Sequence, residues 1–161
     1  MRLEDCTCGK AWEVNLGRFR IYLKEKYNVK EAHYFMGYLR EKNDELYKEI
    51  QKAGFIISFK EHSELLKTKK KGNIDADLVF AVLRTLLEDC ENSQKESAPL
   101  KISKVVLVSG DGDYKKLVNY LIAKGKFEKI LFPNKKYASS LYNQYGSEIF
   151  DYLENIKTYI A

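Results

Sequence analysis

An uninterrupted apolar run, Val105-Val106-Leu107-Val108, leads directly into the acidic segment Ser109-Gly110-Asp111-Gly112-Asp113. The run does not alternate between apolar and polar residues, and such runs form strands that are covered on both faces, as in parallel sheets. In open α/β sheets, ligands bind outside the carboxyl ends of the strands. The sequence therefore predicts a buried parallel strand at 105–108 with a ligand site at its carboxyl end.

Strands and helices alternate along the rest of the chain. Helical spacing of apolar residues predicts helices at 16–27, 43–53, 74–90, 114–124 and 139–145. Short apolar runs bounded by glycine or polar residues predict further strands at 31–37, 55–59, 129–132 and 149–150. This order is typical of an α/β three-layer sandwich with a central, mostly parallel sheet and right-handed crossovers. The 161 residues are expected to form a single domain, 1–161, whose first part, 1–14, is irregular.

The acidic turn has two interpretations. Asp111 and Asp113 place two carboxylates close together, and because like charges repel, such a pair favours a divalent cation such as Mg²⁺ or Mn²⁺. Gly110 and Gly112 would let the chain turn sharply and let a ligand approach the backbone. In the alternative interpretation, Asp111-Gly112 forms an ordinary turn and Asp113 caps the following helix.

A second acidic segment, Lys71-Gly72-Asn73-Ile74-Asp75-Ala76-Asp77, opens the long predicted helix. Acidic side chains are favoured there by the positive end of the helix dipole, which is sufficient to explain both carboxylates. Residues two apart on a helix point about 200° apart, so at most one of them is expected to face the acidic turn. Gly72 would let the helix start approach closely, and Asp75 is therefore the better candidate.

The composition sets broad limits on partners and location. The formal net charge of +5 permits a polyanionic partner but does not by itself indicate one. Three cysteines are an odd number, and Cys6-x-Cys8 lacks the second ligand pair of a structural zinc site. No apolar stretch approaches the ~20 residues of a membrane span, so no membrane partner is expected. These features favour a cytoplasmic protein.

Several segments, in the right order, resemble the NYN branch of the PIN-like nucleases, close to the LabA-like bacterial proteins. Lys71-Gly72-Asn73-Ile74-Asp75 is similar to the family's Lys-Gly-x-Asp helix start, and 106–114 is similar to its Ser-Gly-Asp-Gly-Asp-Phe signature with Tyr114 in place of Phe. Leu117-Val118, Gly125-Lys126, Ser139-Ser140-Leu141 before Phe150, and Tyr34-Phe35-Met36-Gly37 match the remaining pattern. The resemblance spans roughly residues 15 to 153.

The resemblance implies metal-dependent hydrolysis of phosphodiester bonds, usually in RNA. It assigns catalytic and metal-ligand positions to Asp75, Asp111 and Asp113, with Mg²⁺ or Mn²⁺ as the cofactor and Asp77 as a further candidate. Residues expected to bind the substrate, a single-stranded RNA, are Ser109, Lys71, Lys115, Lys116 and Ser140. The lysines support this independently, since basic residues around a metal site attract phosphates without reading sequence.

One part of the family pattern is missing. The family begins with a hydrophobic strand that ends in a metal-ligating Asp, and nothing before Asn15 has that pattern. Either the sequence begins downstream of this strand or the strand has been lost, and Glu4 or Asp5 would be the remaining substitutes. Because the strand lies in the middle of PIN-like sheets, its absence would leave unpaired backbone on its neighbours. A strand donated by a partner chain, as in a homodimer, is one way to restore it.

Two other functions remain open from the sequence. The first is a catalytically impaired RNA-binding or regulatory module that keeps the fold but lacks the first carboxylate. The second is another phosphate-handling α/β enzyme with an Asp-x-Asp turn, such as a Toprim-like or phosphatase-like domain. A Toprim-like site would require a glutamate after an earlier strand, for which Glu61 is the candidate.

Overall fold

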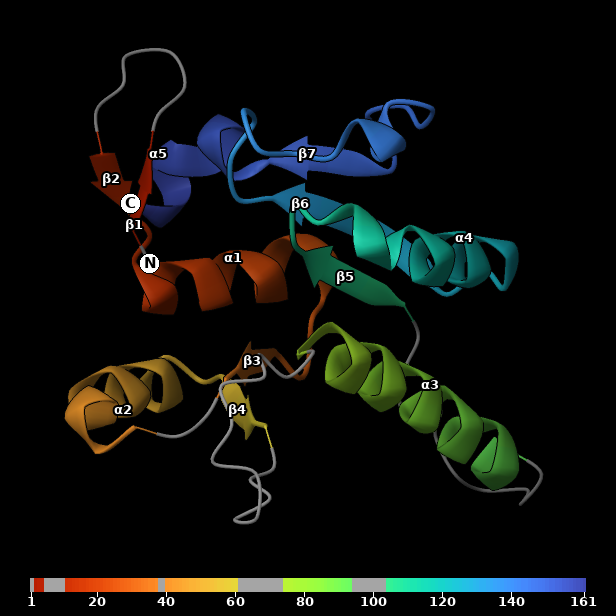
Figure 1. Ribbon diagram of the computed structural model, residues 1–161, viewed down its shortest axis with the longest axis horizontal. Coiled ribbons are helices and arrows are strands. Elements are labelled where there is room, and N and C mark those ends of the chain that lie inside the picture. Colours follow the sequence, from red (N-terminus) through yellow and green to blue (C-terminus); the bar gives the residue numbers. More distant parts are fainter. Residues whose placement is uncertain (1, 5–10, 38–39, 61–73, 94–103) are drawn as a thin grey trace, which may run out of the picture.

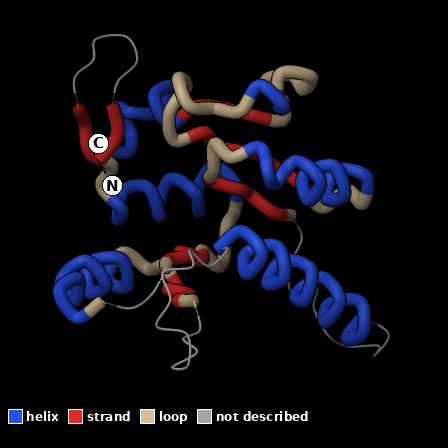
Figure 2. Tube along the Cα trace, viewed as in Figure 1, coloured by secondary structure: helices blue, strands red, loops and turns tan. Residues whose placement is uncertain are grey.

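The computed structural model describes residues 2–4, 11–37, 40–60, 74–93 and 104–161 (Figure 1). The strands are β1 (Arg2–Glu4), β2 (Ala11–Glu13), β3 (His33–Met36), β4 (Ile56–Phe59), β5 (Val105–Val108), β6 (Phe127–Phe132) and β7 (Phe150–Tyr152). The helices are α1 (Leu16–Tyr27), α2 (Asp44–Lys52), α3 (Ile74–Ser93), α4 (Lys115–Ala123) and α5 (Lys157–Ile160), with 3₁₀ helices at Glu41–Asn43, Gly112–Tyr114, Ser140–Tyr142 and Leu153–Ile156. Helices alternate with strands from α1 onward (Figure 2). The predicted α/β class is confirmed.

The strands form three separate ladders. β5, β6 and β7 pair in parallel in that order, β3 pairs in parallel with β4, and β1 pairs antiparallel with β2. The prediction that residues 105–108 form a parallel strand is therefore confirmed.

Alternate residues of β5 and β6 face two different hydrophobic clusters. Val106, Val108 and Leu131 pack with residues of α1 and α5 in one cluster. Leu107 and Ile130 belong to the other cluster, which includes residues of α3 and α4. Helices thus cover both faces of these strands. This explains why the apolar run at 105–108 does not alternate with polar residues.

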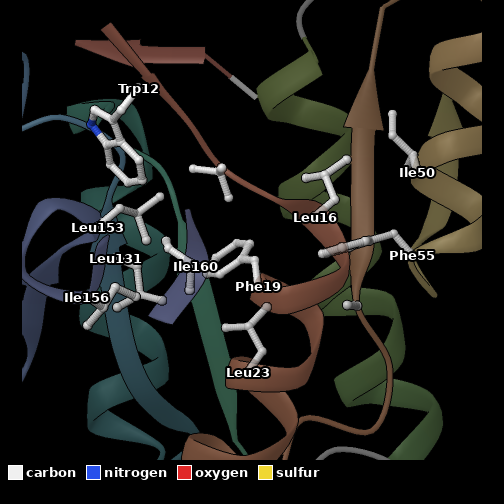
Figure 3. Packing of buried hydrophobic residues seen from close by; sticks show 12 residues of the cluster. Trp12, Leu16, Phe19, Leu23, Ile50, Phe55, Leu131, Leu153, Ile156 and Ile160 are labelled. Atoms are coloured by element: carbon white, nitrogen blue, oxygen red, sulfur yellow. The ribbon is translucent and has the colours of Figure 1, made fainter. Parts of the chain in front are cut away.

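The parallel sheet is interrupted between β3 and β5. Among the described residues, no backbone hydrogen bond joins these two strands, so each has one unpaired edge. Hydrophobic packing nevertheless connects the two parts, because Phe19 and Leu23 of α1 belong to a cluster that contains Phe55, before β4, and Leu131 of β6 (Figure 3).

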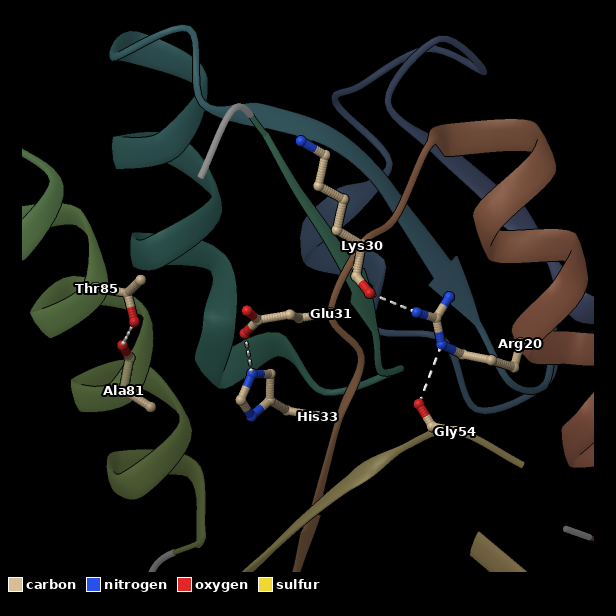
Figure 4. A network of polar contacts seen from close by, with 7 residues as sticks. All are labelled: Arg20, Lys30, Glu31, His33, Gly54, Ala81 and Thr85. Carbon is tan, nitrogen blue, oxygen red and sulfur yellow. Dashed lines mark hydrogen bonds and ion pairs between the residues drawn. The ribbon is translucent and has the colours of Figure 1, made fainter. Parts of the chain in front are cut away.

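The start of β3 and the turn before β4 are both tied to α1 by Arg20. Its guanidinium donates hydrogen bonds to the carbonyl oxygens of Val29 at 3.0 Å, Lys30 at 2.6 Å and Gly54 at 3.2 Å. Figure 4 shows the contacts with Lys30 and Gly54. Gly54 has a φ of +88°, a conformation that glycine adopts without strain. These contacts fix the beginnings of both strands of the smaller parallel sheet.

Two sequence predictions about local structure were wrong. The expected irregular segment 1–14 contains the hairpin β1–β2, and it contributes Trp12 and Val14, which are 7% and 2% exposed, to the core. The expected helix at 139–145 is reduced to a 3₁₀ helix at Ser140–Tyr142. Residues 139–145 are too few for periodicity to distinguish a helix from an extended segment, and the three-residue strands β1 and β2 are too short to show an alternating pattern.

Candidate metal centre

The acidic turn after β5 is held by its own side chains. The Ser109 hydroxyl oxygen accepts a hydrogen bond from the Asp111 amide at 3.1 Å. Asp111 Oδ1 in turn accepts from the Asp113 amide at 2.9 Å, so Asp111 caps the 3₁₀ helix Gly112–Tyr114. The alternative interpretation had assigned the capping role to Asp113; capping is performed by Asp111, which still has its second carboxylate oxygen for a ligand.

A segment that follows β6 packs against this turn. The Ser139 amide donates to the Gly110 carbonyl at 3.0 Å, and the Tyr142 hydroxyl donates to the Asp111 carbonyl at 2.8 Å. Neither Gly110 nor Gly112 has a positive φ. A Cβ atom at Gly112 would lie 2.5 Å from Ser139 Oγ, and one at Gly110 would lie 3.3 Å from the Tyr137 carbonyl oxygen. These glycines therefore serve close packing against the 137–141 segment, which differs from the sharp turn that was expected.

Asp75, in the first turn of α3, is brought to the same place. The Tyr114 hydroxyl donates a short hydrogen bond to Asp75 Oδ1. Asp75, Asp111 and Asp113 each offer one carboxylate oxygen, and these oxygens lie within 4.8 Å of one another. Among the described residues, no other group of three His, Cys, Asp or Glu side chains is arranged in this way.

The donor set fits a hard divalent cation. All three groups are carboxylates, the ligand type that suits Mg²⁺ and Mn²⁺. Within the described part of the chain, neither Asp111 nor Asp113 forms an ion pair with Lys or Arg. Bringing three carboxylates close together is unfavourable because like charges repel, so the arrangement favours binding of a cation.

Two tyrosine hydroxyls donate hydrogen bonds at the carboxylate site. Burial and the hydrogen bond to Asp75 raise the pKa of Tyr114 above its ordinary value. Burial, followed by the charge of Asp111, raises the pKa of Tyr142 to about 12. Both hydroxyls therefore keep their protons at neutral pH and remain hydrogen-bond donors, Tyr114 to Asp75 and Tyr142 to the Asp111 carbonyl.

The other predicted site residues are placed less uniformly. Asp77 is exposed and outside the carboxylate group, as expected for a residue two positions from Asp75. Lys115 is half-buried, whereas Lys116 and Ser140 are exposed beside the 3₁₀ helices of the turn and of its packing segment. Asp5, Glu61 and Lys71 lie outside the described residues.

Sequence reasoning missed Tyr142 and Ser139, which contact the turn from a distant segment. Tyr114 was noted as a departure from the family's Phe, but its hydroxyl was not expected to bind Asp75. The sequence signal was that substitution itself, since a buried tyrosine hydroxyl usually has a hydrogen-bond partner.

Comparison with known protein families gives one match, the NYN domain, over residues 3–152. Neither the comparison with curated proteins nor that with solved structures gave a match. No helix in the described part of the chain is both long enough and apolar enough to cross a membrane.

Proposed function

This chain belongs to the NYN domain family, a nuclease-type superfamily, and we propose that it hydrolyses phosphodiester bonds of RNA with the help of a divalent metal ion. The observation that carries the proposal is the meeting of Asp75, Asp111 and Asp113, whose oxygens lie within 4.8 Å of one another at the carboxyl end of β5. Family membership alone would leave open whether this chain keeps a usable site.

The three aspartates would hold Mg²⁺ or Mn²⁺, which in such sites stabilises charge on the phosphate and lowers the pKa of a bound water. The protein contributes the geometry of the ligands. Tyr114 orients the Asp75 carboxylate, and the Asp113 amide orients that of Asp111. Such supporting hydrogen bonds fix the ligands of a metal site before the metal arrives.

RNA is the proposed substrate, in single-stranded form. Lys116 is exposed next to the acidic turn, and Lys115 is half-buried there. Ser109 and Ser140 are hydroxyl-bearing candidates for phosphate contacts at the same place. Contacts of lysine with phosphates are independent of sequence and are weakened by salt, so they are suited to binding a nucleic acid backbone.

The test is cleavage of a labelled single-stranded RNA in Mg²⁺ or Mn²⁺. Asp111→Asn keeps an oxygen that can accept from the Asp113 amide but removes the charge. Since the loss of a supporting residue already costs about 10- to 100-fold in metal affinity or activity, loss of a ligand should cost at least about 100-fold. Asp77→Asn is the matched control. Asp77 is an exposed aspartate and, like Asp75, is in the first turn of α3, but it lies outside the carboxylate group. Equal activity of the wild type and Asp111→Asn would refute the proposal.

The interruption between β3 and β5 favours a second candidate function. A domain in which β3 and β5 do not pair within the described residues, and whose described carboxylate group has three members, could bind RNA without cleaving it. This candidate predicts salt-sensitive RNA binding that is unchanged by Asp111→Asn and Asp113→Asn, with no cleavage in either metal. A metal-dependent product that disappears with Asp111→Asn would exclude it.

A further inference from the structure

The segment between β6 and the 3₁₀ helix Ser140–Tyr142 runs along the edge of the acidic turn. The Ser139 amide is bonded to the Gly110 carbonyl, and the Tyr137 carbonyl oxygen lies close enough that a Cβ on Gly110 would be 3.3 Å from it. The Asn134 side chain accepts a hydrogen bond from the Lys136 amide at 2.8 Å. Residues 134–139 thus contain a hydrogen-bonded turn at their start and are bonded to the acidic turn at their end.

Tyr137 is an exposed aromatic residue in the segment whose backbone contacts the acidic turn. Its side chain belongs to a residue that is 64% exposed, whereas Tyr142, from the same stretch of chain, is 1% exposed. Lys136 Nζ lies 5.4 Å from the centre of the Tyr137 ring. The neighbouring Lys135 instead places its Nζ 5.6 Å from the ring of Tyr152 in β7. Tyr137 and Lys136 therefore form an exposed aromatic–cation pair that is not used in the core.

Two properties of this pair suit a single-stranded nucleic acid. An aromatic ring offers a face on which any base can stack, and a cation beside it can meet the adjacent phosphate. The ring also has few rotatable bonds, and its backbone is already fixed, so binding would order little additional structure. A base in a duplex is stacked between its neighbours, so only an unpaired base could use the ring.

We propose that Tyr137 is a stacking platform for one unpaired base of the RNA, with Lys136 contacting the phosphate next to it. This inference rests on the proposed function, because it places the stacked base beside the phosphate that the carboxylate site would act on. It goes further by assigning single-strand preference to one residue. The preference follows from the ring, because only an unpaired base can stack on it, and the backbone of the same segment contacts Gly110 of the acidic turn.

The test uses the full chain carrying Asp111→Asn, so that binding is measured without turnover. The probe is a labelled single-stranded RNA of about ten nucleotides, within the usual site size of single-strand grooves. A series of the same RNA with one abasic position at a time locates the base that stacks. Affinities from fluorescence anisotropy are compared for the parent chain, Tyr137→Ala and Tyr137→Phe.

Tyr137→Ala should weaken binding of the intact RNA roughly 5- to 150-fold, the range for loss of one base–aromatic stack. Tyr137→Phe should bind as the parent chain does. One abasic position should weaken the parent chain by a similar factor and should not weaken Tyr137→Ala further. Tyr120→Ala is the matched control. Tyr120 is 47% exposed, and Lys124 Nζ lies 5.8 Å from the centre of its ring. It lies in α4, roughly 10 Å along the helix from the acidic turn.

Failure of the platform and failure of the proposed hydrolysis give different results. If Tyr137→Ala binds the RNA unchanged, or weakens every abasic RNA by the same factor, the platform is overturned even when the wild type cleaves RNA. If the abasic pattern holds but the wild type cleaves no RNA in Mg²⁺ or Mn²⁺, the platform stands and the proposed hydrolysis is rejected. If the parent chain binds no single-stranded RNA, the platform is overturned with it.

Discussion

The Tyr114 hydroxyl links the two acidic segments through a hydrogen bond. Tyr114 is 5% exposed and donates to Asp75, which comes from a helix start 39 residues earlier. This hydrogen bond helps to fix the position of the Asp75 carboxylate. The single oxygen that distinguishes this chain from the family's Phe thus holds one of the three carboxylates.

Tyr114→Phe should weaken metal binding while leaving the fold intact. Removing the donor leaves a partly buried carboxylate without that partner, which should cost about 1–3 kcal/mol of stability. Loss of an orienting group should lower Mn²⁺ affinity about 10- to 100-fold. Titration calorimetry with Mn²⁺ and urea unfolding measure the two effects, with exposed Tyr120→Phe as the control. Unchanged Mn²⁺ affinity would show that the hydrogen bond does not position the ligand.

The residues of the site were predictable where a strand end or a helix start carries the signal. The end of β5 and the first turn of α3 are both visible in the sequence. The roughly 200° separation of Asp75 and Asp77 allowed only one of them to face the turn, and Gly72 favoured Asp75. The contacts of Ser139 and Tyr142 were not predictable, because a contact between segments far apart in the sequence leaves no local pattern. The helical spacing in residues 139–145 extends over too few residues to distinguish an α-helix from a 3₁₀ turn, which explains why this helix was wrongly predicted.

Among the secondary-structure elements, β3, β5 and β6 differ in the number of strands with which each is paired. β6 is paired on both sides, whereas β3 and β5 are each paired on one side within the described residues. An edge strand presents a row of unpaired amide and carbonyl groups. The absence of a hydrophobic strand pattern before Asn15 is visible in the sequence. The short strands β1 and β2, which place Trp12 in the core, were not predicted.

Amide hydrogen exchange should reflect this difference. We expect the amides of β6 to exchange at least about tenfold more slowly than those of β3, corresponding to about 1.4 kcal/mol in local opening. β5 should be intermediate, because it packs on both faces but is paired on one edge. Mass spectrometry or NMR of the isolated chain gives the comparison. Equal protection of β3 and β6 would show that a further strand, such as one from a second copy, pairs with the open edge.

At the scale of the whole molecule, the carboxylate site is a local concentration of negative charge on a chain with a net charge of +5. Repulsion among Asp75, Asp111 and Asp113 opposes folding wherever no cation is bound, because unfolding separates them. A metal that binds only the folded chain therefore stabilises it by mass action. This coupling tests the site independently of any RNA.

Mn²⁺ at a hundredfold excess over its Kd should add about 2.7 kcal/mol to the free energy of unfolding. For a chain of this size the midpoint of thermal unfolding should rise by roughly 5–10 °C. Asp111→Asn should unfold at a higher temperature than the wild type in EDTA, because one repelling charge is gone, but it should gain little from Mn²⁺. Asp77→Asn should respond to Mn²⁺ as the wild type does, since Asp77 lies outside the group. A similar Mn²⁺ response in Asp111→Asn would mean that the metal binds elsewhere on the chain.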